Sequence, residues 1–197
     1  MSLTSRNKVL IYLTLSIMLF GVGLAFASRN KRRMVKFAES LVGQQEISGN
    51  MGFNNKEFQK LMEEVGWGAG DSWCVYLVKL VWYNTAPSWL KAKILKKVSG
   101  SSWQTWVNLK DDDSFITSKT PEVGDIVIWK KYKGGVYVGS GHAGFVVGKN
   151  LDNTFDTIEG NTSDENNNEG YIVANKTREL DFTNNNGLRL IGFIRFA

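Results

Sequence analysis

One cysteine and one histidine occur among the 197 residues, so thiol and imidazole chemistry can involve only Cys74 and His142. Cys74 follows Gly70-Asp71-Ser72-Trp73 and begins a run that we predict to be helical. A helix N-terminus favours an anion, and thiolate is the reactive form of cysteine. The N–H groups of the first helical turn could also hold an oxyanion. Cys74 is therefore placed for attack on a carbonyl carbon, although an inert buried cysteine also fits an apolar helix.

His142 follows Gly139-Ser140-Gly141 and precedes an alternating apolar run, so we expect it at the start of a strand. An imidazole in this position could take the thiol proton and later protonate a leaving amine. Considered alone, the residue is also compatible with a purely structural role.

Glu159 and Asn161 lie in a third polar stretch, on a strand where residues two apart share a face. Either side chain could accept a hydrogen bond from an imidazole N–H and fix its tautomer. Two polar residues at a strand end are the alternative. The order of a helical cysteine, a strand histidine and a polar acceptor is that of papain-like cysteine enzymes.

Composition excludes several other functions. A single cysteine rules out an internal disulfide, and one cysteine with one histidine is too few for a Cys/His zinc site. Residues 1–33 hold six of the 24 basic residues and none of the 19 acidic ones, which leaves residues 34–197 with 18 basic and 19 acidic side chains. This balance does not support nucleic-acid binding. We expect no metal, no cofactor and no nucleic-acid partner.

Two regions differ in character. Residues 9–27, VLIYLTLSIMLFGVGLAFA, carry no charge over 19 positions, and such a helix spans about 28 Å, close to the hydrocarbon thickness of a bilayer. Basic residues precede the run and Ala25-Phe26-Ala27 ends it, as in a signal peptide. We interpret residues 1–33 as a membrane anchor or signal segment that contacts the membrane through residues 9–27. A buried core helix is disfavoured because the run has no polar face.

Residues 34–197 show helical patterns first and strand patterns later. Helices are expected near residues 35–42, 58–65, 74–84 and 89–98. Strands are expected at 125–129, 136–138, 142–147, 155–158, 171–174 and 188–196. Helices followed by strands indicate an α+β domain with an antiparallel sheet.

At this point the sequence resembles the CHAP domain, the family of cysteine- and histidine-dependent amidohydrolases and peptidases. Residues 70–78, 121–129, 141–147 and 157–162 carry the resemblance, and 190–195 resemble the last strand of the family. The resemblance implies a papain-like fold, with the nucleophile at a helix start packed on an antiparallel sheet. It also implies a peptidoglycan hydrolase that cuts the N-acetylmuramoyl-L-alanine amide or a peptide bond through an acyl-enzyme.

Carried over by motif, Cys74 matches the nucleophile, His142 the base and Glu159 the residue that orients the histidine. Asn161 matches a fourth polar position. Gly68 departs from the papain pattern, which has a glutamine six residues before the cysteine. The alternative is therefore an inactive CHAP-fold envelope or virion protein with a structural or binding role.

The basic residues flanking residues 9–27 complicate the location. Four basic residues follow the run and two precede it, so the positive-inside rule keeps residues 34–197 in the cytoplasm, where the same machinery would act on another amide. A wall substrate instead requires an envelope location, anchored or secreted. Cleavage after Ala27, later release from the membrane or delivery by a phage particle would each provide it. Neither this choice nor the oligomeric state follows from the sequence.

Overall fold

The computed structural model describes residues 29–163 and 170–197. The chain separates into two units, Met1–Arg33 and Met34–Ala197. Within the described ranges no helix has the length and apolarity needed to cross a membrane. The predicted membrane segment, residues 9–27, lies outside them.

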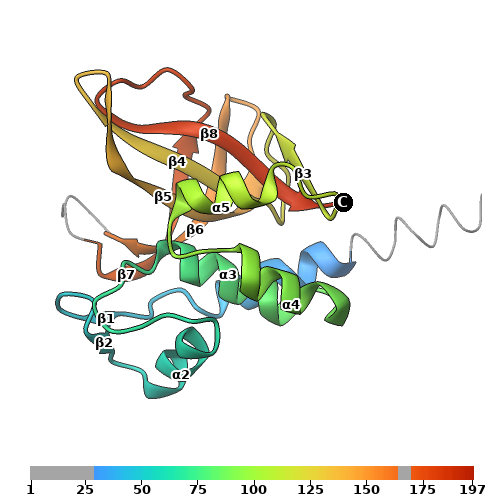
Figure 1. Cartoon of the computed structure of the whole chain (residues 1–197), viewed down its shortest axis with the longest axis vertical. Coiled ribbons are helices and arrows are strands. Elements are labelled where there is room, and N and C mark those ends of the chain that lie inside the picture. Colours follow the sequence, from blue (N-terminus) through green and yellow to red (C-terminus); the bar gives the residue numbers. More distant parts are fainter. Residues whose placement is uncertain (1–28, 164–169) are drawn as a thin grey trace, which may run out of the picture. The chain divides into compact units, whose positions relative to one another are not determined.

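Helices dominate the first half of Met34–Ala197 (Figure 1). Residues 29–39 are helical, and a short hairpin of β1 (Glu46–Ile47) and β2 (Gly52–Phe53) follows. Then come four helices, namely α2 (Lys56–Glu64), α3 (Cys74–Thr85), α4 (Ser88–Lys97) and α5 (Ser102–Leu109). The predicted helices near 58–65, 74–84 and 89–98 match α2, α3 and α4. The hairpin and α5 were not predicted.

The second half forms one six-stranded sheet, antiparallel at each pairing, in the order β3-β8-β4-β5-β6-β7. The predicted α+β class with an antiparallel sheet is confirmed. The strands are β3 (Phe115–Ser118), β4 (Ile126–Lys133), β5 (Val136–Lys149), β6 (Thr154–Thr162), β7 (Ile172–Glu179) and β8 (Gly187–Phe196).

The strand that carries His142 differs from the prediction. Two strands, 136–138 and 142–147, were expected, whereas β5 continues through the glycines between them. Backbone pairing with β4 sustains it, because Lys130 lies opposite Gly141 and Trp129 opposite His142. His142 therefore lies inside a strand, not at its start.

Both faces of the sheet are apolar. One face contributes Ile126, Ile128, Phe145 and Ile158 to the main core, where α3 is buried. The other face gathers a smaller cluster, made of Val127, Trp129, Val146, Phe155, Leu190 and Phe193. Helix α3 contacts β5 and β6. This contact brings the start of α3 to the strands that hold His142 and Glu159.

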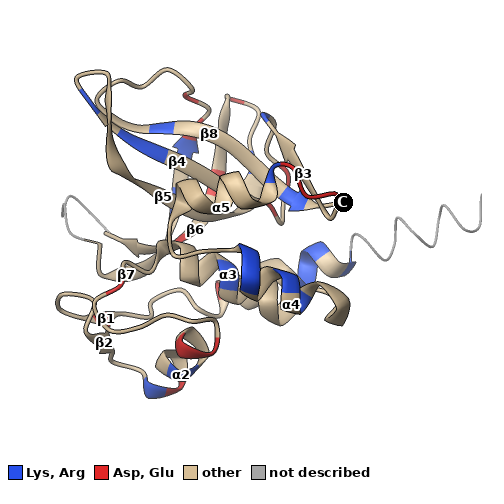
Figure 2. Cartoon of the chain, viewed as in Figure 1, with Lys and Arg blue, Asp and Glu red and all other residues tan. Residues whose placement is uncertain are grey.

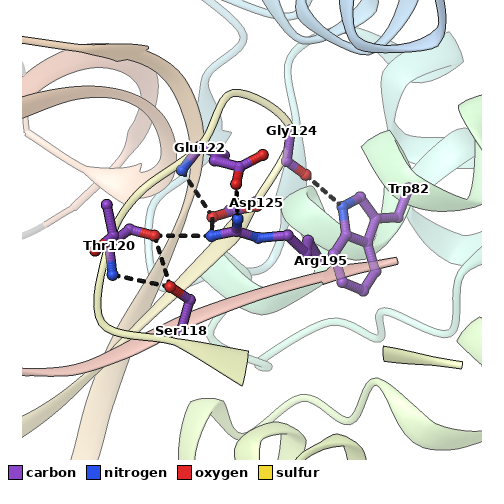
Figure 3. Close-up of polar contacts among 7 residues, drawn as sticks. All are labelled: Trp82, Ser118, Thr120, Glu122, Gly124, Asp125 and Arg195. Atoms are coloured by element: carbon purple, nitrogen blue, oxygen red, sulfur yellow. Dashed lines mark hydrogen bonds and ion pairs between the residues drawn. The ribbon is translucent and has the colours of Figure 1, made fainter. Parts of the chain in front are cut away.

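A buried ion pair fixes the start of β4 (Figure 3). Asp125, which is 1% exposed, accepts hydrogen bonds from Arg195 Nη2 at 2.8 Å and from the Glu122 N–H at 2.9 Å. Trp82 Nε1 of α3 donates to the carbonyl of neighbouring Gly124 at 3.0 Å. Burial raises the pKa of Asp125 to about 7, although Arg195 and the Glu122 N–H oppose the shift. The cluster joins the turn before β4 to β8 and α3.

Basic and acidic residues are spread over the helices and strands of Met34–Ala197 (Figure 2). Helix α4 carries lysines, two of which, Lys93 and Lys97, contact the carboxylate of Asp112. Helix α2 carries acidic residues in its first and last turns. No group of three or more potential metal ligands comes together in residues 29–163 and 170–197.

Candidate active site

Cys74 occupies the first position of α3, as the sequence predicted. The cap residue Trp73 makes no side-chain hydrogen bond to the helix end, so its side chain does not occupy the first-turn N–H groups. The sulfur accepts hydrogen bonds from the backbone N–H groups of Val75 and Ala143. Cys74 is 7% exposed. Its thiol is thus held by the helix start on one side and by β5 on the other.

The structure brings Cys74, His142 and Glu159 together in one chain of hydrogen bonds. The His142 ring bonds the Cys74 thiol. Its Nε2 lies 2.8 Å from Glu159 Oε2, which leaves Nδ1 for the sulfur. Trp129, the β4 partner of His142, has its ring centroid 5.8 Å from the imidazole. The ring is therefore oriented at both nitrogens.

Glu159 is fully buried and has several partners. Its Oε1 accepts from Thr157 Oγ1 at 2.7 Å and from Arg178 Nε at 2.8 Å. Its Oε2 accepts from Arg178 Nη2 at 2.5 Å, besides bonding His142. Burial disfavours ionisation, but the hydrogen bonds and charges of Arg178 and His142 outweigh it and hold the pKa of this carboxyl well below its usual range. Glu159 is consequently an anion.

The electrostatics favour a thiolate and an imidazolium. Burial by itself would raise the pKa of Cys74, but the hydrogen bond and charge of His142, with two backbone N–H groups, lower it. Burial by itself would lower the pKa of His142, but Glu159 and Cys74 raise it to about 10. The two groups titrate as a coupled pair, and both shifts favour the form Cys74⁻ with His142⁺.

Two glycines allow the close approach that the site requires. A Cβ on Gly144 would lie 2.9 Å from Glu159 Cγ, so a larger residue would displace the carboxylate. A Cβ on Gly160 would lie 2.5 Å from Cζ3 of Trp73, the residue before the thiol. Glycine at position 144 lets β5 approach Glu159, and glycine at position 160 lets β6 approach the start of α3.

Asn161 lies apart from the imidazole chain. Its backbone has φ +52°, and the pairing of β6 with β7 shifts between Glu159 and Thr162. Its Nδ2 donates to the Gly170 carbonyl at 2.8 Å and to Asn50 Oδ1 at 3.1 Å, and lies 3.5 Å from Glu46 Oε2. Because Glu46 also accepts from Trp73 Nε1 at 2.5 Å, Asn161 belongs to a network beside the helix start.

Arg178 is the site residue that the sequence analysis missed. It lies on β7, where exposed and partly buried residues alternate, and an arginine in such a strand is ordinarily assigned to solvent. Only the pairing of β7 with β6 brings it beside Glu159, which is 19 residues earlier in the chain.

The comparisons agree with this geometry. The family model of the CHAP domain matches residues 65–161, a range that includes Cys74, His142, Glu159 and Asn161. Searches of curated proteins and of solved structures found no match. The matched range holds the cysteine, histidine and glutamate brought together here, and the match supports a CHAP-domain family protein.

Proposed function

We propose that this protein hydrolyses an amide bond of peptidoglycan, with Cys74 as nucleophile, His142 as acid and base, and Glu159 orienting the imidazole. The match to the CHAP-domain family indicates an amidase or peptidase that acts on peptidoglycan. The observation that carries the proposal is the hydrogen-bonded chain from the Cys74 thiol through His142 to the buried carboxylate. A helical cysteine facing a strand histidine is also the papain-like arrangement that we propose for the fold.

The proposed reaction has two halves. The Cys74 thiolate attacks the carbonyl carbon, and His142 gives its proton to the leaving nitrogen, so a thioester forms as the amine departs. Neutral His142 then takes a proton from water, the resulting hydroxide adds to the thioester, and the acid product leaves as the thiolate re-forms. Glu159 orients the imidazole and stabilises the imidazolium whenever it forms, in the role of the third member of a catalytic triad.

The bond cut is either the N-acetylmuramoyl-L-alanine amide or a peptide bond of the stem or cross-bridge. For Asn161, the contacts with Glu46 and Asn50 support a role in holding the β1–β2 hairpin beside the site. We also propose that residues 1–33 form an anchor or signal segment, and that residues 34–197 act in the cell envelope. The uncharged run at 9–27 and the family's wall substrate support this location.

The test is digestion of purified sacculi by the full chain, with mass spectrometry of the released fragments. Cys74→Ala and His142→Ala are expected to lower the release rate at least about 10³-fold, because each removes a member of a unit that acts together. Lys96→Ala, at an exposed position of α4, is the control. A new amine on L-alanine identifies the amidase and any other new amine a peptidase.

Full activity in either Cys74→Ala or His142→Ala would refute the assignment. Saturable binding to sacculi without fragment release, together with an unreactive Cys74, would instead support an inactive binding protein. Gly68, where papain-type enzymes have glutamine, is the feature that favours this second candidate.

A further inference from the structure

Arg178 makes a two-point contact with the carboxylate that orients His142. Its Nε and Nη2 bond the two oxygens of Glu159 at 2.8 and 2.5 Å. The arginine side chain is 30% exposed, whereas that of Glu159 is fully buried. The guanidinium also lies 5.7 Å from the ring centroid of Trp129. Arg178 therefore approaches the site from the side of Glu159 that the imidazole leaves open.

The charges of the site balance only when Arg178 is counted. Cys74⁻, His142⁺ and Glu159⁻ alone would form a buried group with a net negative charge, which is costly in a protein interior. Arg178 completes an alternating series of four charges with no net charge. Of the other charged groups nearby, Glu46 bonds Trp73 at the rim of the site, and Lys176 contributes its carbonyl to Thr157.

We propose that Arg178 is a positioning residue of the active site, which clamps both oxygens of Glu159 and balances its charge so that the Cys74–His142 ion pair forms at neutral pH. This inference rests on the proposed function, because it assigns a role in that same site. A bidentate arginine restricts the carboxylate more than a lysine would, since the guanidinium fork matches both oxygens.

Loss of Arg178 raises the pH at which the Cys74 thiolate forms, whether Glu159 stays ionised or becomes protonated. If Glu159 stays ionised, removal of a nearby positive charge makes every proton in the site harder to remove. If Glu159 becomes protonated, His142 loses its anionic partner and stabilises the thiolate less. In both cases the thiolate forms at higher pH.

The experiment is the pH dependence of iodoacetamide alkylation of the full chain in a neutral detergent, followed by mass spectrometry. Cys74 is the only cysteine, so each mass increment reports on one thiol. Arg178→Gln keeps a hydrogen-bond donor without charge, and Arg178→Lys keeps the charge without the fork. Arg189→Gln is the matched control, because Arg189 lies over the Tyr132 ring and bonds Asn184 and Asn185.

The alkylation rate rises with pH as the thiolate forms, and this rise is called the alkylation limb. Arg178→Gln is expected to move the alkylation limb to a pH about one unit higher, which is about tenfold slower labelling at a fixed pH below the limb. Arg178→Lys is expected to keep the limb near that of the wild type but to lower kcat on sacculi more than it changes KM. Arg189→Gln is expected to match the wild type in both assays.

An unchanged alkylation limb in folded Arg178→Gln would show that Arg178 only stabilises the fold and would overturn the proposal. A wild-type kcat in Arg178→Lys would overturn the proposal that the guanidinium clamps both oxygens of Glu159. The lysine variant therefore also tests the proposal if Arg178→Gln does not fold. Alkylation requires no substrate. A wild-type chain that digests no sacculi would therefore refute the proposed function while leaving the Arg178 result readable.

Discussion

The ion pair of Cys74 and His142 leads to a prediction about folding stability. In the unfolded chain near pH 7.5 the thiol holds one proton and the imidazole is neutral, because their ordinary pKa values are about 8.5 and 6.5. In the folded chain the imidazolium holds that proton, since the pKa of Cys74 is lowered and that of His142 is raised to about 10. Both states bind one proton, so the pair contributes almost no pH dependence between about pH 7 and 8.

Cys74→Ser removes the thiol proton of the unfolded state, which offsets the imidazolium proton of the folded state in the wild type. Serine does not titrate, but His142 keeps its 2.8 Å contact with Glu159, and we expect the charge of Glu159 to keep the imidazole protonated in the folded state when the thiol is absent. A group with a raised pKa in the folded state stabilises below its unfolded pKa, and that stabilisation is lost as pH rises toward the folded pKa. The free energy of unfolding of Cys74→Ser is therefore expected to fall by about 1 kcal/mol from pH 7 to pH 8, relative to the wild type.

The assay is urea unfolding followed by tryptophan fluorescence, with both proteins in the same neutral detergent. Asp125, with a pKa of about 7, contributes equally to both proteins and cancels in the comparison. Cys74→Ser/His142→Asn is the control and should lose the extra slope, because His142 is the only histidine. The same change from pH 7 to pH 8 in Cys74→Ser and the wild type would refute the expectation that Glu159 keeps His142 charged without the thiolate.

Two further predictions concern the framework of the site. Gly160→Ala places a Cβ 2.5 Å from Cζ3 of fully buried Trp73, so we expect a loss of about 1–3 kcal/mol, seen as a lower urea midpoint; an unchanged midpoint would contradict it. Because burial raises the pKa of Asp125 to about 7, this carboxyl makes wild-type stability fall as pH rises from about 4 to 7. Asp125→Asn should remove about 2 kcal/mol of the fall in unfolding free energy between pH 5 and 7. Urea unfolding at the two pH values measures this fall, and an equal fall in the variant and the wild type would disprove the prediction.

The elements that hold the nucleophile were predictable because their signals are local. The apolar run from Cys74 indicated a buried helix, and α3 begins at that residue. Helix α5 was missed because Ser102 and Thr105 form most of its buried face. Their hydroxyl groups bond the Trp129 and Ser99 carbonyls, so a polar pattern conceals a packed one.

The sequence by itself determined which groups could react, since it contains a single thiol and a single imidazole, and it indicated the glutamate that meets them. Tertiary structure decided the remainder of the site. Arg178 reaches Glu159, and Asn161 turns toward Asn50, through strand pairing and a register shift that join distant parts of the chain. The physical reason is that a shift of one residue in strand register reverses which side chains face the site, and local sequence patterns do not specify that register.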